Sequence, residues 1–243
     1  MIYIERTQVQ LDEAPLVLFD NILLDGTVTA TTEATDAEVE NLLTDSTFDF
    51  WKPTTTSGTV SLSLGSAGTA SALGIAGHDL GTQGATVTVK QGATTLATVS
   101  PADDSTIIIL FDSTSATAFS VEITGASSAP YISNMFLGAP LVFTTGIVPS
   151  YTPLWMAEEV ELLQNQSLGG QFFQNRVIRK SANTPVNLNI LERSFIEAAP
   201  FQSFRRHYND GKTFFFAAGP ATFEDDGSFC RRGGDTLKPT FAR

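Results

Sequence analysis

A chain of 243 residues is long enough for one large domain or for two domains of roughly 100–150 residues, each with a buried core. Hydrophobic residues make up 42% of it and charged residues only 16%, which favours a sandwich whose outer faces carry Thr and Ser in place of Lys and Glu. The formal net charge of -12 is uneven, with three basic and 16 acidic residues before Phe143 and eleven basic and ten acidic residues from there on. Because an acidic front half repels phosphate groups, we expect no nucleic-acid binding by it.

The sequence carries no signal for export, for membrane insertion or for a disulfide. Its first residues include charges and no apolar run of signal-peptide length. Apolar stretches such as Thr106–Phe111 and Thr213–Ala218 are far shorter than the ~20 residues that a spanning helix needs. With Cys230 as its single cysteine, the chain alone can form no intrachain disulfide, four-cysteine metal site or iron–sulfur cluster. We therefore predict no membrane span, no metal and no cofactor.

The first 40 residues are predicted to be an N-terminal arm with a docking segment. Val17–Leu24 is apolar enough to cross a sandwich or to dock onto a neighbouring protein. Thr27–Glu40 is rich in Thr, Ala and acidic residues, which indicates an exposed loop or an irregular arm.

From Gly58 onward, short β-strands separated by turn residues are predicted, a spacing typical of a sandwich. In the first strand apolar residues from Val60 to Leu64 alternate with polar ones, and Gly65–Gly68 is predicted to end it. The further predicted strands are Ala72–Ala76, Ala85–Lys90, Thr94–Val99, Thr106–Phe111 and Phe119–Ile123. Of these, Thr106–Phe111 is β-branched and apolar throughout, which favours a central strand.

Beyond Pro149 the pattern changes. Glu158–Leu163 and Gln171–Arg179 are predicted to be paired strands, because Asn, Ser and Gly-Gly between them favour a turn. Val186–Ile190 alternates and is predicted to be another strand.

A helix is predicted next, with Ser194 as its N-cap and Glu197 three residues further, the spacing of a capping box. Pro200 is predicted to divide this helix, and Asn209-Asp210-Gly211 to end it. Thr213–Ala217 is predicted to be a final strand, and the polar tail beyond it to lie along a surface. This strand–helix–strand order predicts a compact α+β domain over residues 144–243.

The two histidines are the natural starting points for a catalytic site, because general-base catalysis most often uses imidazole. We favour structural roles, with His78 tying a turn to nearby backbone and His207 meeting the carbonyl end of a helix. The sequence has no Gly-x-Ser-x-Gly elbow, no Gly-x-Gly-x-x-Gly after a strand and no phosphate-binding loop. Nucleotide chemistry and serine hydrolysis are therefore unsupported.

The acidic pairs are the other route to catalysis. Candidate carboxylates are Asp45 with Asp49, Asp103 with Asp104, and Asp225 with Asp226, all in turn-like settings. Glycoside cleavage needs two carboxylates across a cleft, whereas neighbouring Asp residues are usually turn formers. A calcium ion near Asp45 stays open, although no dense Asp/Asn/Gly loop is present. Cys230 has flanking cations but no base nearby in sequence, so we predict that its thiol is packed or incidental. Taken together, these candidates lead us to predict that the protein is not an enzyme.

The segment Asn41–Asp45 followed by Phe48–Pro53 resembles the entry of discoidin-like, galactose-binding-like sandwiches, with Trp51 as the aromatic anchor. It is also similar to the phage-tail variant of that domain, in which Trp-x-Pro precedes a strand ending in Leu-Gly, here Val60–Gly65. A Gly-His-x-Leu-Gly turn follows, here Gly77–Gly81, and the resemblance continues to Gly138. It implies a mainly β fold, with a jelly-roll type sandwich over residues 41–143 followed by the smaller α+β domain. The implied structural anchors are Trp51, Pro53, Gly77, His78 and Gly81.

The back half is similar, more loosely, to companion domains of tail-tip proteins of long-tailed bacteriophages. The matching pieces are Gly169-Gly170-Gln171, Phe195–His207, and Lys212–Phe216 with Gly219-Pro220. The resemblance implies a minor tail or baseplate protein of the virion, assembled in the host cytoplasm into an oligomeric ring with other tail proteins.

Three functions follow from these observations. The first is a structural component that acts through protein–protein interfaces, with the candidate interface residues Leu18, Phe19, Arg205, Arg206, Arg231 and Arg232. The alternative is a carbohydrate-binding module for host-surface attachment, with a host glycan as ligand. A glycosidase or peptidase is the third, and it needs a cleft with two carboxylates or a His-centred triad.

Overall fold

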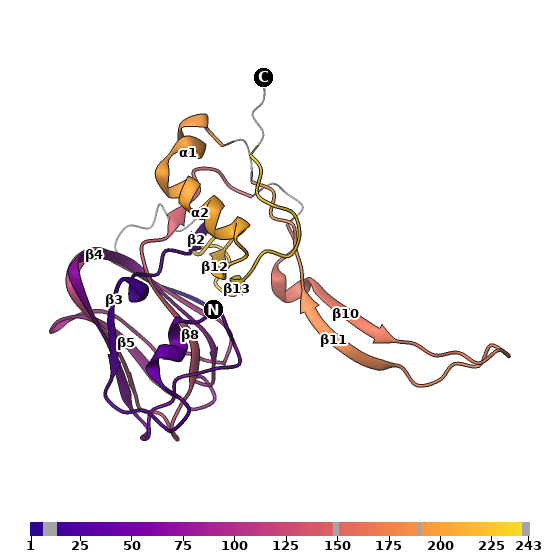
Figure 1. The fold of residues 1–243 in the computed structure, drawn as a ribbon, viewed down its shortest axis with the longest axis horizontal. Helices are drawn as coiled ribbons and strands as arrows, with labels where there is room; N and C mark the ends of the chain where they lie inside the picture. Colours follow the sequence, from indigo (N-terminus) through magenta and orange to yellow (C-terminus); the bar gives the residue numbers. More distant parts are fainter. Residues whose placement is uncertain (7–13, 148–150, 189–190, 240–243) are drawn as a thin grey trace. The chain divides into compact units, whose positions relative to one another are not determined.

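The computed structural model describes residues 1–6, 14–147, 151–188 and 191–239, and β-strands dominate it (Figure 1). Two compact units are present: Met1–Gly146 with Ile190–Arg243, and Ile147–Asn189. No helix in the described ranges is long and apolar enough to cross a membrane.

The larger unit contains a seven-stranded β-sheet that folds over itself into a sandwich (Figure 1). Its strands are β1 (Ile2–Glu5), β3 (Gly26–Ala30), β4 (Gly58–His78), β5 (Thr86–Gln91), β6 (Thr94–Val99), β7 (Ile107–Thr124) and β8 (Ile132–Gly138). The long strands β4 and β7 pair along their lengths, with register shifts between Ser63 and Gly68 and between Ala70 and Ala72. At one end β3 and β5 flank this pair, and at the other end β8 and β1 do. We call the part of the sheet that contains β3 and β5 the outer layer, and the part that contains β8 and β1 the inner layer.

The main core lies between these two layers. Alternating residues of the outer layer, such as Val60 and Val121, face Leu73, Ile109 and other apolar residues of the inner layer. Trp51 is fully buried in this core, and its backbone pairs with Ile132 (N···O 2.8 and 3.0 Å). Its indole Nε1 donates to the Thr32 carbonyl oxygen at 3.3 Å, which satisfies the ring's polar atom inside the protein.

Three strand predictions for this unit need correction. Gly65–Gly68 does not end a strand, because the backbone passes through it as an irregularity within β4. Thr106–Phe111 and Phe119–Ile123 lie in one strand, β7, which pairs with β4 and β5. The predicted loop Thr27–Glu40 contributes β3, because Val28 packs on the core while its Thr neighbours face outward.

A second, four-stranded sheet covers the other face of the inner layer. Its strands, in spatial order, are β13 (Gly227–Cys230), β12 (Phe214–Ala217), β2 (Leu16–Leu18) and β9 (Leu141–Val142). Phe215 and Leu18 pack here against Ile108, Leu110 and Phe136. This sheet joins strands from both chain ends, so the contacts cross the predicted boundaries at residues 40 and 143. Independent folding of those predicted domains stays a prediction.

Two short helices pack beside this sheet, α1 (Arg193–Glu197) and α2 (Ala199–Asn209). Phe204 of α2 lies against the rings of Phe19, Phe143 and Phe214. As predicted, the helix is divided at Pro200, which occupies the first turn of α2, where a missing N–H costs nothing.

The helix start and the chain beyond β12 differ from the predictions. Glu192, not Ser194, is the N-cap of α1, and it makes no side-chain cap. Gly211, with φ +75, lies beyond the end of α2, as the turn prediction requires. The segment after Gly219 was predicted to lie along a surface, but part of it forms β13, which pairs with β12 in the second sheet.

The smaller unit is a β-hairpin, β10 (Glu158–Leu163) and β11 (Arg176–Ala182), after a short 3-10 turn at Leu154–Met156 (Figure 1). The predicted pairing is confirmed, although the second strand begins later than Gln171. No strand forms over residues 186–188, where Leu188 makes an isolated bridge to Ile147. Residues 189–190 of that predicted strand lie outside the described residues.

Gly74→Ala tests the packing of the second sheet on the sandwich. A Cβ at Gly74 would lie 2.7–2.8 Å from ring atoms of the fully buried Phe215, so we expect destabilisation by about 1–3 kcal/mol. Gly65→Ala is the matched control in the same strand, because a Cβ there meets nothing within 4 Å. Urea unfolding measures both, and equal stabilities would contradict the packing.

Candidate functional site

The most unusual surface of the protein is the smaller unit, which we call the apolar hairpin (residues 147–189). Of the 14 large hydrophobic residues that are exposed in the described part of the chain, eleven lie in it. They are Trp155, Met156, Val160, Leu162, Leu163, Leu168, Phe172, Phe173, Val177, Ile178 and Val186. Soluble monomers rarely leave apolar side chains gathered in this way, so this surface is a candidate interface.

Both outer edges of the hairpin are open. β10 and β11 pair only with each other among the described strands, with a register shift at Glu161–Leu162. Each strand therefore presents a row of backbone N–H and C=O groups that can accept another strand. A hairpin of two strands by itself is marginally stable in water, which also favours added contacts.

The charges of the hairpin are separated by strand. β10 holds the three acidic residues Glu158, Glu159 and Glu161, and the three basic ones, all on β11, are Arg176, Arg179 and Lys180. Two ion pairs join the strands, Lys180–Glu158 at 2.9 Å and Arg179–Glu161 at 3.6 Å. Because all four side chains are largely exposed, these pairs add little stability.

The tip between the strands is an ordered turn. The N–H of Ser167 donates to the Gln171 carbonyl oxygen and the N–H of Gly170 to that of Ser167, both at 2.9 Å. Gly170 adopts φ +82, which favours glycine. The turn leaves Leu168 and Phe172 exposed, so apolar groups occupy the tip as well as the strands.

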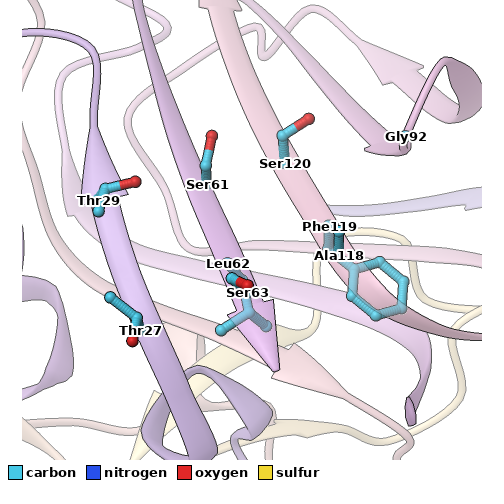
Figure 2. Close-up of a pocket in the computed structure, with 9 residues that line it drawn as sticks. All are labelled: Thr27, Thr29, Ser61, Leu62, Ser63, Gly92, Ala118, Phe119 and Ser120. Atoms are coloured by element: carbon cyan, nitrogen blue, oxygen red, sulfur yellow. The ribbon is translucent and has the colours of Figure 1, made fainter. Parts of the chain in front are cut away.

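A second candidate surface is a shallow hollow of about 320 Å³ on the exposed face of the outer layer. Figure 2 shows the hydroxyl groups of Thr29, Ser61 and Ser120 on the neighbouring strands β3, β4 and β7. Strand register places them in one row, since Thr29 pairs with Ser61 and Ser61 with Ser120. The next residue in that row is Lys90 of β5, which is ion-paired with Glu122 at 2.6 Å. The hollow offers hydrogen-bonding groups but no exposed aromatic ring, because Phe119 beneath it is buried.

His78 lies in a turn that is tied to the neighbouring loop. Its Nε2 donates to the Ser105 carbonyl oxygen at 2.7 Å, and its Nδ1 accepts from the Leu80 N–H at 3.2 Å, which requires the neutral ring. Burial lowers the pKa of His78 below its usual value, against the opposing effects of the Ser105 carbonyl and the carboxylates of Asp104 and Asp79. Both ring nitrogens are thus used for structure.

The other anchors from the resemblance also lie in tight packing. A Cβ at Gly58 would lie 2.8 Å from the Trp51 ring and 3.0 Å from Pro53, so these residues pack on the start of β4. Gly77 adopts φ +63. A Cβ at Gly81 would come within 2.2 Å of the Asp103 backbone, so the two loops approach closely only because Gly81 has no side chain.

The predicted interface residues are separated by the fold. Leu18 and Phe19 are buried against the chain's own residues, so they offer no surface to a partner. Arg205 donates to the Leu237 carbonyl oxygen, and Arg232 to that of Asn209 at 2.8 Å. Arg206 and Arg231 are exposed and keep their candidate role.

The catalytic candidates do not gather into one site. His207 Nε2 contacts the Thr213 carbonyl oxygen at 2.6 Å, and Asp45 accepts a hydrogen bond from the Thr213 hydroxyl. Burial, and to a lesser degree Asp226, raises the pKa of the Cys230 thiol to about 12, although the residue as a whole is partly accessible. No group of three or more His, Cys, Asp or Glu residues that could hold a metal occurs among the described residues.

Sequence reasoning predicted the hairpin but missed its exposed surface. The available signal was the adjacent apolar pairs Leu162-Leu163, Phe172-Phe173 and Val177-Ile178. Neighbouring side chains in a strand point to opposite faces, so such pairs place apolar groups on both faces at once. A two-stranded hairpin cannot bury both faces by itself.

Comparisons with solved structures match about half of the chain. A chitosan-binding module of a chitosanase/glucanase from Paenibacillus sp. IK-5 is 18% identical, with a TM-score of 0.40, over 48% of this chain and 96% of the module. A module from Clostridium perfringens in complex with GalNAc-β-1,3-galactose is 13% identical, with a TM-score of 0.42, over 51% and 99%. The family 32 carbohydrate-binding module of C. perfringens NanJ, in complex with galactose, is 13% identical, with a TM-score of 0.41, over 51% and 98%.

No protein-family model matches the chain, and no match is found among curated proteins. The predicted mainly β class is confirmed by the structure itself, which contains a β-sandwich and a second small sheet with two short helices. The discoidin-like form of the sandwich stays a prediction. The finer resemblance, to phage tail proteins, finds no counterpart among these structures.

The two hydrogen bonds of His78 predict a pH effect on stability. The unfolded imidazole, with a pKa near 6.5, takes up a proton at higher pH than the folded one, so stability is full above pH 6.5 and declines as the pH falls below it. We expect the melting temperature of wild type to decrease when the pH is lowered from about 7.5 to about 5.5. The decrease should be smaller in His78→Gln. Identical profiles for His78→Gln and wild type would refute the assignment.

Proposed function

We propose that this protein is a non-enzymatic structural subunit of a larger assembly and that it acts through protein–protein interfaces. Following the sequence resemblance, we place that assembly at the tail tip or baseplate of a long-tailed bacteriophage, put together in the host cytoplasm. The observation that carries the proposal is the apolar hairpin, with exposed hydrophobic side chains on its strands, its tip and its first turn.

The energetics favour a covered hairpin. Full burial of one large apolar side chain contributes roughly 1.5–3 kcal/mol, and eleven such side chains are exposed here. In the described residues of the larger unit, in contrast, most large apolar side chains are buried, and only Leu24, Phe48 and Phe223 are exposed. Large apolar side chains are therefore mostly buried in the larger unit and exposed in the hairpin. This distribution is expected of a subunit that docks through one element.

Phe172 and Phe48 provide a matched pair of variants, since both side chains are 88% exposed and only Phe172 lies in the hairpin. We expect Phe172→Ser to lower incorporation of the chain into purified phage particles by about tenfold, because it removes an apolar anchor from the interface. Phe48→Ser should be incorporated like wild type. Quantitative mass spectrometry of the particles measures both. Particles that lack even the wild-type chain would refute the tail assignment, and normal incorporation of Phe172→Ser would exclude the tip from the interface.

Carbohydrate binding is a second candidate function, and the hydroxyl row in the hollow of the outer layer favours it. Hydroxyl groups donate and accept hydrogen bonds, as sugar hydroxyls do, and Thr29, Ser61 and Ser120 present three of them on one rigid sheet face (Figure 2). A host-surface glycan is the ligand that this role implies.

Ser120→Val tests this second function, because it removes the hydroxyl at the end of the row and adds two methyl groups to the hollow. If the hollow binds glycans, the variant should lose at least about tenfold in affinity on a glycan array followed by calorimetry. Ser66→Val is the control, since Ser66 is exposed on β4 outside the hollow. A wild-type protein that binds no glycan would remove this candidate.

A further inference from the structure

We infer that the partner of the apolar hairpin is a second copy of this chain, which adds its β10 edge to the β11 edge of the first copy, head to tail. This inference rests on the proposed function and deepens it by naming the partner and the direction of pairing. The result is one continuous sheet, ordered β10-β11-β10-β11 across successive copies.

The separation of charges selects this pairing. All acidic residues of the hairpin unit lie on β10 and all basic ones on β11, so the edges of one hairpin carry opposite charge. Pairing of β10 with β11 of a neighbour places Glu158, Glu159 and Glu161 opposite a basic strand. Opposite charges across neighbouring strands stabilise a sheet, and like charges destabilise it.

The other two edge pairings are disfavoured by the same charges. A symmetric dimer through β10 would set three glutamates against three glutamates, and one through β11 would set basic residues against basic residues. Such two-fold pairing is the commonest geometry for oligomers in general. Here it is the arrangement that the charges oppose.

Strand direction agrees with head-to-tail addition. β10 and β11 are antiparallel within one hairpin, so two hairpins that point the same way bring β11 of one copy antiparallel to β10 of the next. Every neighbouring pair in the growing sheet then has the geometry that already exists inside the hairpin. The chain thus contains a template for its own interface.

Apolar and charged groups are both available for the new contact. Val160 and Leu162 on β10, with Val177 and Ile178 on β11, are exposed and would be covered by strands on either side. Glu159 and Arg176 make no ion pair among the described residues, in contrast to the two pairs inside the hairpin. They are the charges that remain for the neighbouring copy.

Head-to-tail contacts have a consequence for the assembly. The two surfaces in contact are different, so each copy still offers one edge after pairing, and addition continues until a ring closes or a filament grows. A symmetric contact would stop at two copies.

The first test is self-association of the full chain, measured by native mass spectrometry and light scattering. We expect oligomers larger than dimers that weaken about tenfold between about 0.1 M and about 1 M NaCl, as the Debye length shortens from about 10 Å to about 3 Å. Reversal of β10 alone, with Glu158→Lys, Glu159→Lys and Glu161→Lys, should abolish them. A wild-type chain that stays monomeric, or stops at a dimer, would overturn the inference.

The second test exchanges the charges of both strands. The swapped chain combines Glu158→Lys, Glu159→Lys and Glu161→Lys with Arg176→Glu, Arg179→Glu and Lys180→Glu, so its ion pairs within the hairpin are retained with reversed sign. Head-to-tail pairing predicts that the swapped chain assembles with itself and that wild type and swapped chains sort apart when mixed. Symmetric pairing through one edge predicts mixed oligomers, because each wild-type edge then prefers the swapped one. Mixed oligomers would therefore refute the head-to-tail geometry.

These results are distinguishable from failure of the proposed function. If the chain does not self-associate but Phe172→Ser still blocks incorporation into particles, another protein covers the hairpin, and only the inference about the second copy is wrong. If self-association follows the charge rules while incorporation of Phe172→Ser is normal, the self-pairing stands and the proposed docking through the tip is wrong.

Discussion

β4 and β7 pair with each other from Gly58–Ile123 to Ile75–Ile107, and each has different neighbours at its two ends. The pair therefore belongs to both layers of the sandwich, and the remaining strands add to it in register. Where the pair changes layer, register shifts replace a regular ladder, and small residues such as Gly68 accommodate the irregular backbone. Without this one antiparallel pairing, neither the main core nor the site for the second sheet would exist.

Burial on both faces follows from that pairing. In the inner layer, Leu73 and Ile109 face the main core, while Ala72 and Leu110 face the second sheet. The second sheet can approach closely because Gly74 carries no side chain where the Phe215 ring lies. Strands from both chain ends meet in this sheet, so the larger unit is stabilised by contacts between residues far apart in sequence, such as Leu18 and Phe215.

The apolar hairpin follows the opposite principle. Among the described strands, β10 and β11 pair only with each other, and eleven large apolar residues of the hairpin are exposed. The same hydrophobic effect that fills the sandwich core therefore favours association at the hairpin. Charges add direction to this association, because an acidic strand and a basic strand make the two edges different. The described part of the larger unit thus buries most of its large apolar residues, whereas the hairpin leaves eleven of them exposed.

The sequence by itself determined the β class, most of the strands, the turn at Gly211, the division of the helix at Pro200 and the hairpin after Pro149. These features depend on local alternation and on the backbone preferences of Gly and Pro, which one sequence displays. Only the tertiary structure decided that β4 and β7 run through both layers, that Leu18 and Phe19 are core residues, and that the apolar residues of the hairpin are exposed. The sequence does not distinguish an apolar side chain that is buried inside the chain from one that is exposed on its surface. The difference lies in which distant strands, such as β12 beside β2, come to cover it.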